Sequence, residues 1–247
     1  MKINSGALLL VITACAAAQT PAALPPPGGS IVGPEGNPLS NRRVGPSGPV
    51  PKMADGKPDL SGIWYSLRTM DAGTPKMAPW AAEVLKQRNP KDDPEAHCLP
   101  AGVPRMNPFP WKIAQTEKLL VMLFEGNIHS YRQIFLDGRD HPKDLDPTWY
   151  GHSIGKWDGD TLVVDTIGFN DKFWFDFAGH PHTEKLHVIE RYHRRDRGNL
   201  DMDITIFDPD AYTEPWKIKR TSALMNGEIQ EYICNENNQD VEHLVGK

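Results

Sequence analysis

Residues 141–171, with the sequence HPKDLDPTWYGHSIGKWDGDTLVVDTIGFND, decide the fold of this chain. Two runs rich in β-branched and aromatic residues flank the pair Asp158-Gly159. Such a pair between two alternating runs predicts a β-hairpin with a two-residue turn. Counting outward from that turn places His152 on one strand directly opposite Asp165 on the other.

An imidazole and a carboxylate in this arrangement have Cβ atoms about 5 Å apart. Asp165 could then hold one ring nitrogen of His152, fix its tautomer and raise its basicity, as a general base requires. A three-residue turn would place His152 opposite Thr166 instead, and the pair would be lost. A pair that only orders the sheet is the structural alternative. The sequence leaves both alternatives open.

The strand pattern continues along most of the chain after residue 110. Residues 200–207 alternate between apolar and polar side chains, so one face meets a core and the other meets water. The other expected strands are residues 119–124, 129–136, 185–193, 216–223 and 229–234. About eight or nine strands with short connections favour an all-β fold, an antiparallel barrel, because closure removes exposed edges.

One helix is expected, at residues 79–87, with Pro79 in its first turn and Trp80, Val84 and Leu85 on one face. Before residue 79 the chain has long loops and a first strand near Trp64. The helix is expected to cover one end of the barrel.

Two charged residues fall on strand faces that are otherwise apolar. Glu190 shares its face with Val188 and Tyr192. Arg132 has apolar neighbours, such as Ile134, on its own strand. A buried charge is costly unless it is paired, so we expect an ion pair of Glu190 with Arg132 inside the barrel, either as a structural element or as a ligand clamp.

Aromatic residues are frequent between the central hairpin and the next strand, and they could line an apolar pocket or cover the core. They are Trp149, Tyr150, Phe169, Phe173, Trp174 and Phe175. The expected ligand contacts are Arg132, Tyr150, Trp174, His182 and Tyr192. The expected catalytic groups are His152 and Asp165, with Glu190 or His180 as a further partner.

A second histidine cluster, Gly179-His180-Pro181-His182, is followed by His187. Two histidines separated by one residue can bind a metal, and Glu184 or Glu190 could complete the set. The spacing matches no closed structural zinc site, so a polar loop at the barrel rim is the favoured interpretation. We therefore expect no cofactor, with a metal at His180, His182 and His187 as the weaker alternative.

The composition excludes several classes of partner. The 27 basic and 32 acidic residues give a formal net charge of -5, so no strong field attracts nucleic acid. The chain lacks a nucleophile elbow, a phosphate-binding glycine loop, a dinucleotide fingerprint and an H-E-x-x-H helix. A small apolar or aromatic molecule is the expected partner, and the oligomeric state is left open.

Residues 1–18 have the pattern of a secretory signal peptide, with Lys2 before an apolar run. Residues 12–15, ITAC, resemble a bacterial lipobox, in which Cys15 would be lipidated and anchor the chain to the cell envelope. Ordinary cleavage after residues 16–18 would discard Cys15. Both alternatives predict an exported, periplasmic or envelope-bound protein. The Pro- and Gly-rich residues 19–57 are expected to form a disordered linker, and residues 58–247 a single barrel domain.

Export gives the remaining cysteines a structural meaning. With Cys15 lipidated or removed, Cys98 and Cys234 are the two that remain in the mature chain. An oxidising compartment favours a disulfide between them. A reactive thiol is the alternative.

Short motifs add a resemblance to known proteins. Gly62-Ile63-Trp64 resembles the G-x-W signature of the first strand of lipocalins and other calycin barrels, which implies that Trp64 closes the barrel floor. The strings DGKPDLSGIW, GHSIGKWDGDTLVVDT and CNENN resemble an uncharacterised family of secreted bacterial proteins. This second resemblance implies export and carries no activity.

Three functions are compatible with these features. The first is an exported enzyme that uses the His, Asp and Glu groups in a barrel cavity for isomerisation, elimination or hydration of an apolar or carbonyl compound. The second is a lipocalin-like carrier of a hydrophobic ligand, and the third is a structural envelope lipoprotein. Several titratable groups converging on one cavity would favour the enzyme.

Overall fold

The computed structural model describes residues 46–105, 109–126 and 130–236. The expected signal peptide, Cys15 and most of the expected linker lie outside these residues. No helix in the described ranges is both long and apolar enough to span a membrane.

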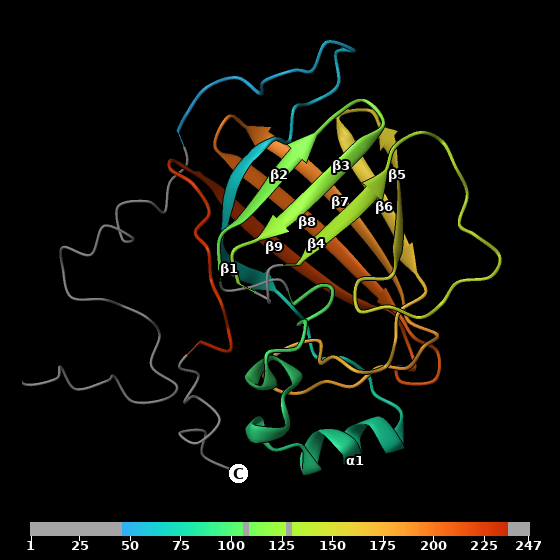
Figure 1. Ribbon diagram of the computed structural model, residues 1–247. Coiled ribbons are helices and arrows are strands. Elements are labelled where there is room, and N and C mark those ends of the chain that lie inside the picture. Colours follow the sequence, from blue (N-terminus) through green and yellow to red (C-terminus); the bar gives the residue numbers. More distant parts are fainter. Residues whose placement is uncertain (1–45, 106–108, 127–129, 237–247) are drawn as a thin grey trace, which may run out of the picture. The chain divides into compact units, whose positions relative to one another are not determined.

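The described chain is built around a closed barrel of nine strands (Figure 1). In chain order the strands are β1 (Gly62–Asp71), β2 (Trp111–Gln115), β3 (Leu119–Phe124), β4 (Tyr131–Phe135), β5 (His152–Asp158), β6 (Thr161–Ile167), β7 (His187–Asp196), β8 (Asn199–Phe207) and β9 (Trp216–Met225). Neighbours in sequence are neighbours in the barrel, and β9 pairs with β1 to close it. The expected all-β, lipocalin-like barrel is confirmed.

One strand pair departs from the expected antiparallel order. β4 and β5 run parallel and pair at two positions only, Ile134 with Ser153 and Phe135 with Ile154. A parallel pair cannot be joined by a tight turn, and here residues 136–151 make the connection. The pairing joins the end of β4 to the start of β5, and the ribbon shows that the other end of β4 lies away from β5 (Figure 1). We call this region the β4–β5 seam.

The register of the central hairpin differs from the expected one. Asp158 pairs with Thr161, so the two turn residues are Gly159 and Asp160, and His152 lies opposite Ile167. Gly159 has a φ of 59°, which a side chain disfavours. The glycine therefore occupies the first central position of the turn, where type II′ turns require it, and not the second.

The barrel core follows from the alternation of the strands. On β6 the side chains of Leu162, Val164 and Thr166 are buried inside, and those between them face outward. Trp64 of β1 is fully buried, and its indole N–H donates to the Leu60 carbonyl oxygen at 2.9 Å. Trp64 is therefore part of the barrel core.

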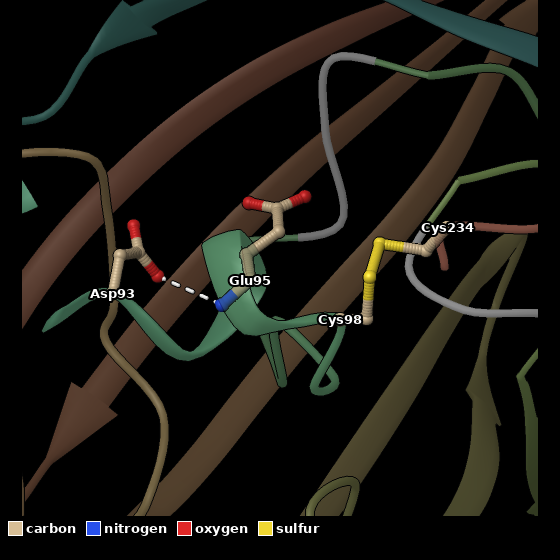
Figure 2. The surroundings of a disulfide bond; sticks show 4 residues. All are labelled: Asp93, Glu95, Cys98 and Cys234. Carbon is tan, nitrogen blue, oxygen red and sulfur yellow. Dashed lines mark hydrogen bonds between the residues drawn. A yellow bond between two sulfur atoms is a disulfide. The ribbon is translucent and has the colours of Figure 1, made fainter. Parts of the chain in front are cut away.

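The helix α1 (Pro79–Gln87) has the expected bounds. It buries Ala81, whereas Trp80 is 43 % exposed and donates from its indole N–H to the Asp210 carbonyl oxygen at 2.8 Å. Two short 3₁₀ turns follow, η2 (Pro90–Asp92) and η3 (Pro94–His97). The Asp93 carboxylate caps η3 by accepting a hydrogen bond from the Glu95 backbone N–H at 3.0 Å (Figure 2).

The expected disulfide between Cys98 and Cys234 is present (Figure 2). It joins the end of η3 to the segment that follows β9. The expected strand at residues 229–234 is wrong, because those residues form no strand. The reason is that β9 already pairs with β8 and β1, so the closed barrel has no free edge for another strand.

Part of the expected linker lies against the barrel. The Gly48 carbonyl oxygen accepts from the Arg197 backbone N–H at 2.9 Å, and Lys52 forms an ion pair with Asp160 at 2.9 Å. Lys52 and Pro58 also form an isolated β-bridge. The described chain is therefore attached to the barrel from about residue 48 onward.

Replacing both cysteines, Cys98→Ala with Cys234→Ala, should lower the free energy of unfolding. The disulfide closes a loop with a sequence separation of 136, and loss of such a link costs about 2–5 kcal/mol. Urea denaturation of the double variant and the parent protein measures the difference. If a thiol reductant opens the disulfide and leaves the urea midpoint of the parent protein unchanged, this expectation is contradicted.

Candidate functional site

A buried ion pair lies inside the barrel and joins β4 to β7. Arg132 Nη2 on β4 lies 2.5 Å from Glu190 Oε2 on β7, and both side chains are 1 % exposed. The expected pair of these two residues is therefore confirmed. Burial by itself lowers the pKa of Arg132, but the charge of Glu190 outweighs it and raises this pKa.

Hydroxyl groups complete the surroundings of this pair. Arg132 Nε donates to Ser153 Oγ at 3.0 Å, and its Nη2 also donates to Thr166 Oγ1 at 2.7 Å. The Tyr192 hydroxyl donates to Glu190 Oε1 at 2.8 Å. Arg132 Nη1 is buried and has no hydrogen-bond partner among the described residues. The network thus links β4 to β5, β6 and β7 and leaves the Nη1 nitrogen of the guanidinium, with its two N–H bonds, unused.

His152 and Asp165 lie on the opposite side of the barrel wall. On β6 the buried residues alternate with Asp165, whose side chain is 40 % exposed. His152 pairs with Ile167, and Asp165 lies two residues before Ile167 on β6. His152 and Asp165 are therefore neighbours on the same outward face of the sheet. The four expected groups do not share one interior cavity, because Arg132 and Glu190 face inward and the other two face outward.

A third histidine connects His152 to Asp165. His141, from the connection between β4 and β5, places its Nδ1 2.8 Å from His152 Nδ1. Its Nε2 lies 3.3 Å from Asp165 Oδ1. His187 Nε2, on β7, lies 2.8 Å from the same carboxylate oxygen. We call His141, His152, Asp165 and His187 the outer histidine cluster.

For a neutral His141 ring, the hydrogen bonds of this cluster assign the tautomers of two rings. An ionised carboxylate only accepts, so His141 carries its proton on Nε2 and donates it to Asp165. The neutral His141 ring then accepts at Nδ1, which requires His152 to donate from its own Nδ1. His152 Nε2 is left with its lone pair, which is the arrangement of a general base oriented by a second and a third group.

Electrostatics keep this base neutral. Burial lowers the pKa of His152, and the positive charge of the neighbouring Arg139 lowers it further. The ring also stacks on Phe135, with centroids 5.3 Å apart. His152 is therefore in its unprotonated form at neutral pH and can accept a proton.

A cavity of about 340 Å³ opens beside His152, and we call it the seam pocket. It is lined by Pro100, Tyr131, Arg132, Gln133, Phe135, Thr148, Trp149, Tyr150, Gly151, His152 and Ser153. Successive residues of a strand point to opposite faces, and the lining includes both the outward His152 and the inward Ser153 of β5, so the cavity lies where β4 and β5 border each other. Residues from both faces of the sheet thus contribute to the lining of this cavity.

Tyr150 contributes a hydroxyl to the seam pocket. Its ring stacks on Phe124, which faces the barrel interior, with centroids 5.7 Å apart. Its oxygen accepts a hydrogen bond from Ser130 Oγ at 2.5 Å. Burial raises the pKa of Tyr150 to about 12, so the phenol keeps its proton at neutral pH. The hydroxyl is therefore a hydrogen-bond donor.

The second expected cluster does not come together as a metal site. His180 Nδ1 lies 2.7 Å from Asp176 Oδ2, whereas His182 Nδ1 lies 3.2 Å from the Thr183 carbonyl oxygen. His187 belongs to the outer histidine cluster. Throughout the described ranges no group of three or more His, Cys, Asp or Glu side chains could hold a metal ion.

The expected aromatic contacts divide between the pocket and the core. Tyr150 and Trp149 line the seam pocket. Phe169, Phe173 and Phe175 are buried in the core. Trp174 is 6 % exposed, with the Arg88 guanidinium 4.7 Å above its ring. Tyr192 is part of the buried network and does not reach the pocket lining.

His141, Ser153 and Phe135 are site residues that sequence reasoning missed. His141 lies in a loop without periodicity, so no pattern places it beside His152. Ser153 could have been found, because it is a polar residue at an inward position next to Ile154 and Gly155. Phe135 follows from the parallel pairing of β4 with β5, which the sequence did not predict.

Comparison of the chain with protein-family models, with curated proteins and with solved structures finds no match.

His182 should make the fold sensitive to acid. Burial lowers the pKa of His182 to about 4, and an unfolded histidine titrates near 6.5. The unfolded chain therefore binds a proton between these values and the folded chain does not, so stability is lost as the pH falls from about 6.5 to 4. The loss should reach about 3 kcal/mol.

The variant His182→Phe removes this titration and provides the comparison. Urea midpoints measured from pH 7 to pH 4 should fall less steeply for His182→Phe than for the parent protein. Equal slopes for the two proteins would show that His182 is not buried in its neutral form.

Proposed function

We propose that the protein is an enzyme that transfers a proton on a small aromatic carbonyl compound bound in the seam pocket. His152 is the base and Tyr150 is the donor to the carbonyl oxygen. The observation that carries the proposal is the hydrogen-bonded chain from Asp165 through His141 to His152, which ends at the wall of the seam pocket.

The proton transfer follows from the tautomers of the outer histidine cluster. His152 Nε2 takes a proton from the carbon next to the carbonyl group, so a C–H bond breaks and an N–H bond forms. The electron pair moves to the carbonyl oxygen, where the Tyr150 O–H donates a hydrogen bond to the enolate. The imidazolium of His152 keeps its Nδ1–H hydrogen bond to His141, which donates to Asp165, and it returns the proton to carbon or to oxygen.

The lining of the seam pocket supports an aromatic substrate. Tyr131, Phe135, Trp149 and Tyr150 all contribute to it. Aromatic rings pack well in offset or edge-on contacts with such side chains. A cavity of about 340 Å³ is at the small end of ligand sites, which fits a substrate with a single ring.

A non-catalytic carrier of the same aromatic compound is the second candidate, and the aromatic lining favours it equally. The two functions differ in the role of His152, which a carrier does not need as a base. Export as a periplasmic or envelope-anchored protein is part of both proposals. The disulfide is consistent with an oxidising compartment, and Cys15 would be the anchor.

Proton exchange tests the enzyme directly. The parent protein should accelerate the exchange of benzylic protons of phenylpyruvate or its methyl ester for deuterium in D₂O, followed by NMR. His152→Gln should slow the catalysed exchange by about 100-fold or more, because it removes the base. Exchange catalysed by the parent should increase as His152 loses its proton, with an apparent pKa below the ordinary histidine value.

The control is His193→Gln, which replaces an exposed histidine on β7 outside the outer histidine cluster. Its exchange rate should equal that of the parent protein. If His152→Gln binds the compound and exchanges its protons as fast as the parent does, the proposed base is wrong. Binding without exchange in the parent would favour the carrier.

A further inference from the structure

We infer that the substrate of the seam pocket carries a carboxylate, which Arg132 binds through its Nη1 group. The inference rests on the proposed function for the identity of the site. It adds the chemical class of the substrate, an aromatic compound with a carbonyl and a neighbouring carboxylate. A 2-oxo acid with an aryl group is the simplest example.

The first argument is the unused donor. The Nε and Nη2 groups of Arg132 point to the barrel wall, where they donate to Ser153, Thr166 and Glu190. The Nη1 group is buried and unpartnered among the described residues. A buried N–H without a partner is costly, and here it belongs to a residue that lines the seam pocket.

The second argument is the charge balance inside the barrel. Arg220, on β9, lies on the same strand face as the inward residues Ile218 and Ser222 and is an inward cation as well. Its pKa is lowered by burial, and Glu190 is the first group that opposes this. Glu190 forms its ion pair with Arg132, and Arg220 has no carboxylate within ion-pair distance in the described part of the chain; its Nη1 group donates to the Pro104 carbonyl oxygen. One further negative charge would balance them.

The third argument is access. β4 and β5 are paired at two positions, and Arg132 lies two residues before the first of them, Ile134, on β4. Residues 131–133 and 151–153 line the cavity, and Arg132 Nη1 lies buried behind it. The carboxylate reaches Nη1 when the side chains between the two strands move aside. The aromatic ring of the substrate then remains among Phe135, Trp149 and Tyr150. The carbonyl group of the substrate lies between this ring and the carboxylate.

A matched pair of ligands tests the inference on the unaltered protein. Phenylpyruvate and its methyl ester share the ring and the ketone and differ in charge. Calorimetric titration should show that phenylpyruvate binds about 10- to 100-fold more tightly, as expected for a charge-assisted hydrogen bond in a buried site. Equal affinities would overturn the inference.

A double variant identifies the residue responsible. Arg132→Gln alone leaves Glu190 buried and unpaired, which destabilises the fold, so it is combined with Glu190→Gln to keep a neutral pair of similar volume. The double variant should bind the ester as the parent does and lose its preference for the acid. A preserved preference would overturn the assignment to Arg132.

An exposed arginine provides the control for position. The Arg139 guanidinium lies 3.9 Å above the ring of Phe135, at the rim of the seam pocket, and is paired with Asp137. Arg139→Gln should keep the preference for phenylpyruvate, because its charge is exposed and screened. Loss of the preference in this variant would overturn the inference in favour of Arg139.

The outcomes separate this inference from the proposed function. Exchange of the ester that depends on His152, without any preference for the acid, would retain the enzyme and remove the carboxylate site. A clear preference for the acid without proton exchange would retain the carboxylate site and remove the enzyme.

Discussion

The rest of the structure depends on a guanidinium that is buried inside an apolar barrel. Arg132 is 2 % exposed, and a charge in that environment requires a carboxylate and hydroxyl groups around it. Glu190, Ser153 and Thr166 supply them from three different strands. The ion pair therefore ties β4 to β7 across the place where the strand pairing is weakest.

That weakness creates the seam pocket. Eight of the nine strand contacts around the barrel are antiparallel, and the β4–β5 contact is parallel and two residues long. Strands that diverge expose both faces of the sheet at one opening, so the inward Arg132 and the outward His152 border the same cavity. A fully paired sheet would separate these two residues by its own thickness.

The outer histidine cluster depends on the long connection between β4 and β5. Hydrogen bonds from the Thr148 N–H to the Gly168 carbonyl oxygen, and from the Asn170 N–H to the Thr148 carbonyl oxygen, hold its end against the segment after β6. His141 then lies over the hairpin and links His152 to Asp165. The parallel pairing thus accounts for both parts of the candidate site, since it requires the connection and opens the seam.

The sequence by itself determined the barrel, the bounds of α1, the disulfide and the buried pair of Arg132 with Glu190. These features follow from local periodicity, from a cysteine count and from the cost of an unpaired buried charge. The tertiary structure decided the hairpin register, the parallel pair and the position of His141. The physical reason is that turn type, strand direction and loop path depend on contacts between distant residues, such as Ile134 with Ser153, which no local pattern encodes. His152 and Asp165 belong to one site because His141 lies between them, not because they face each other.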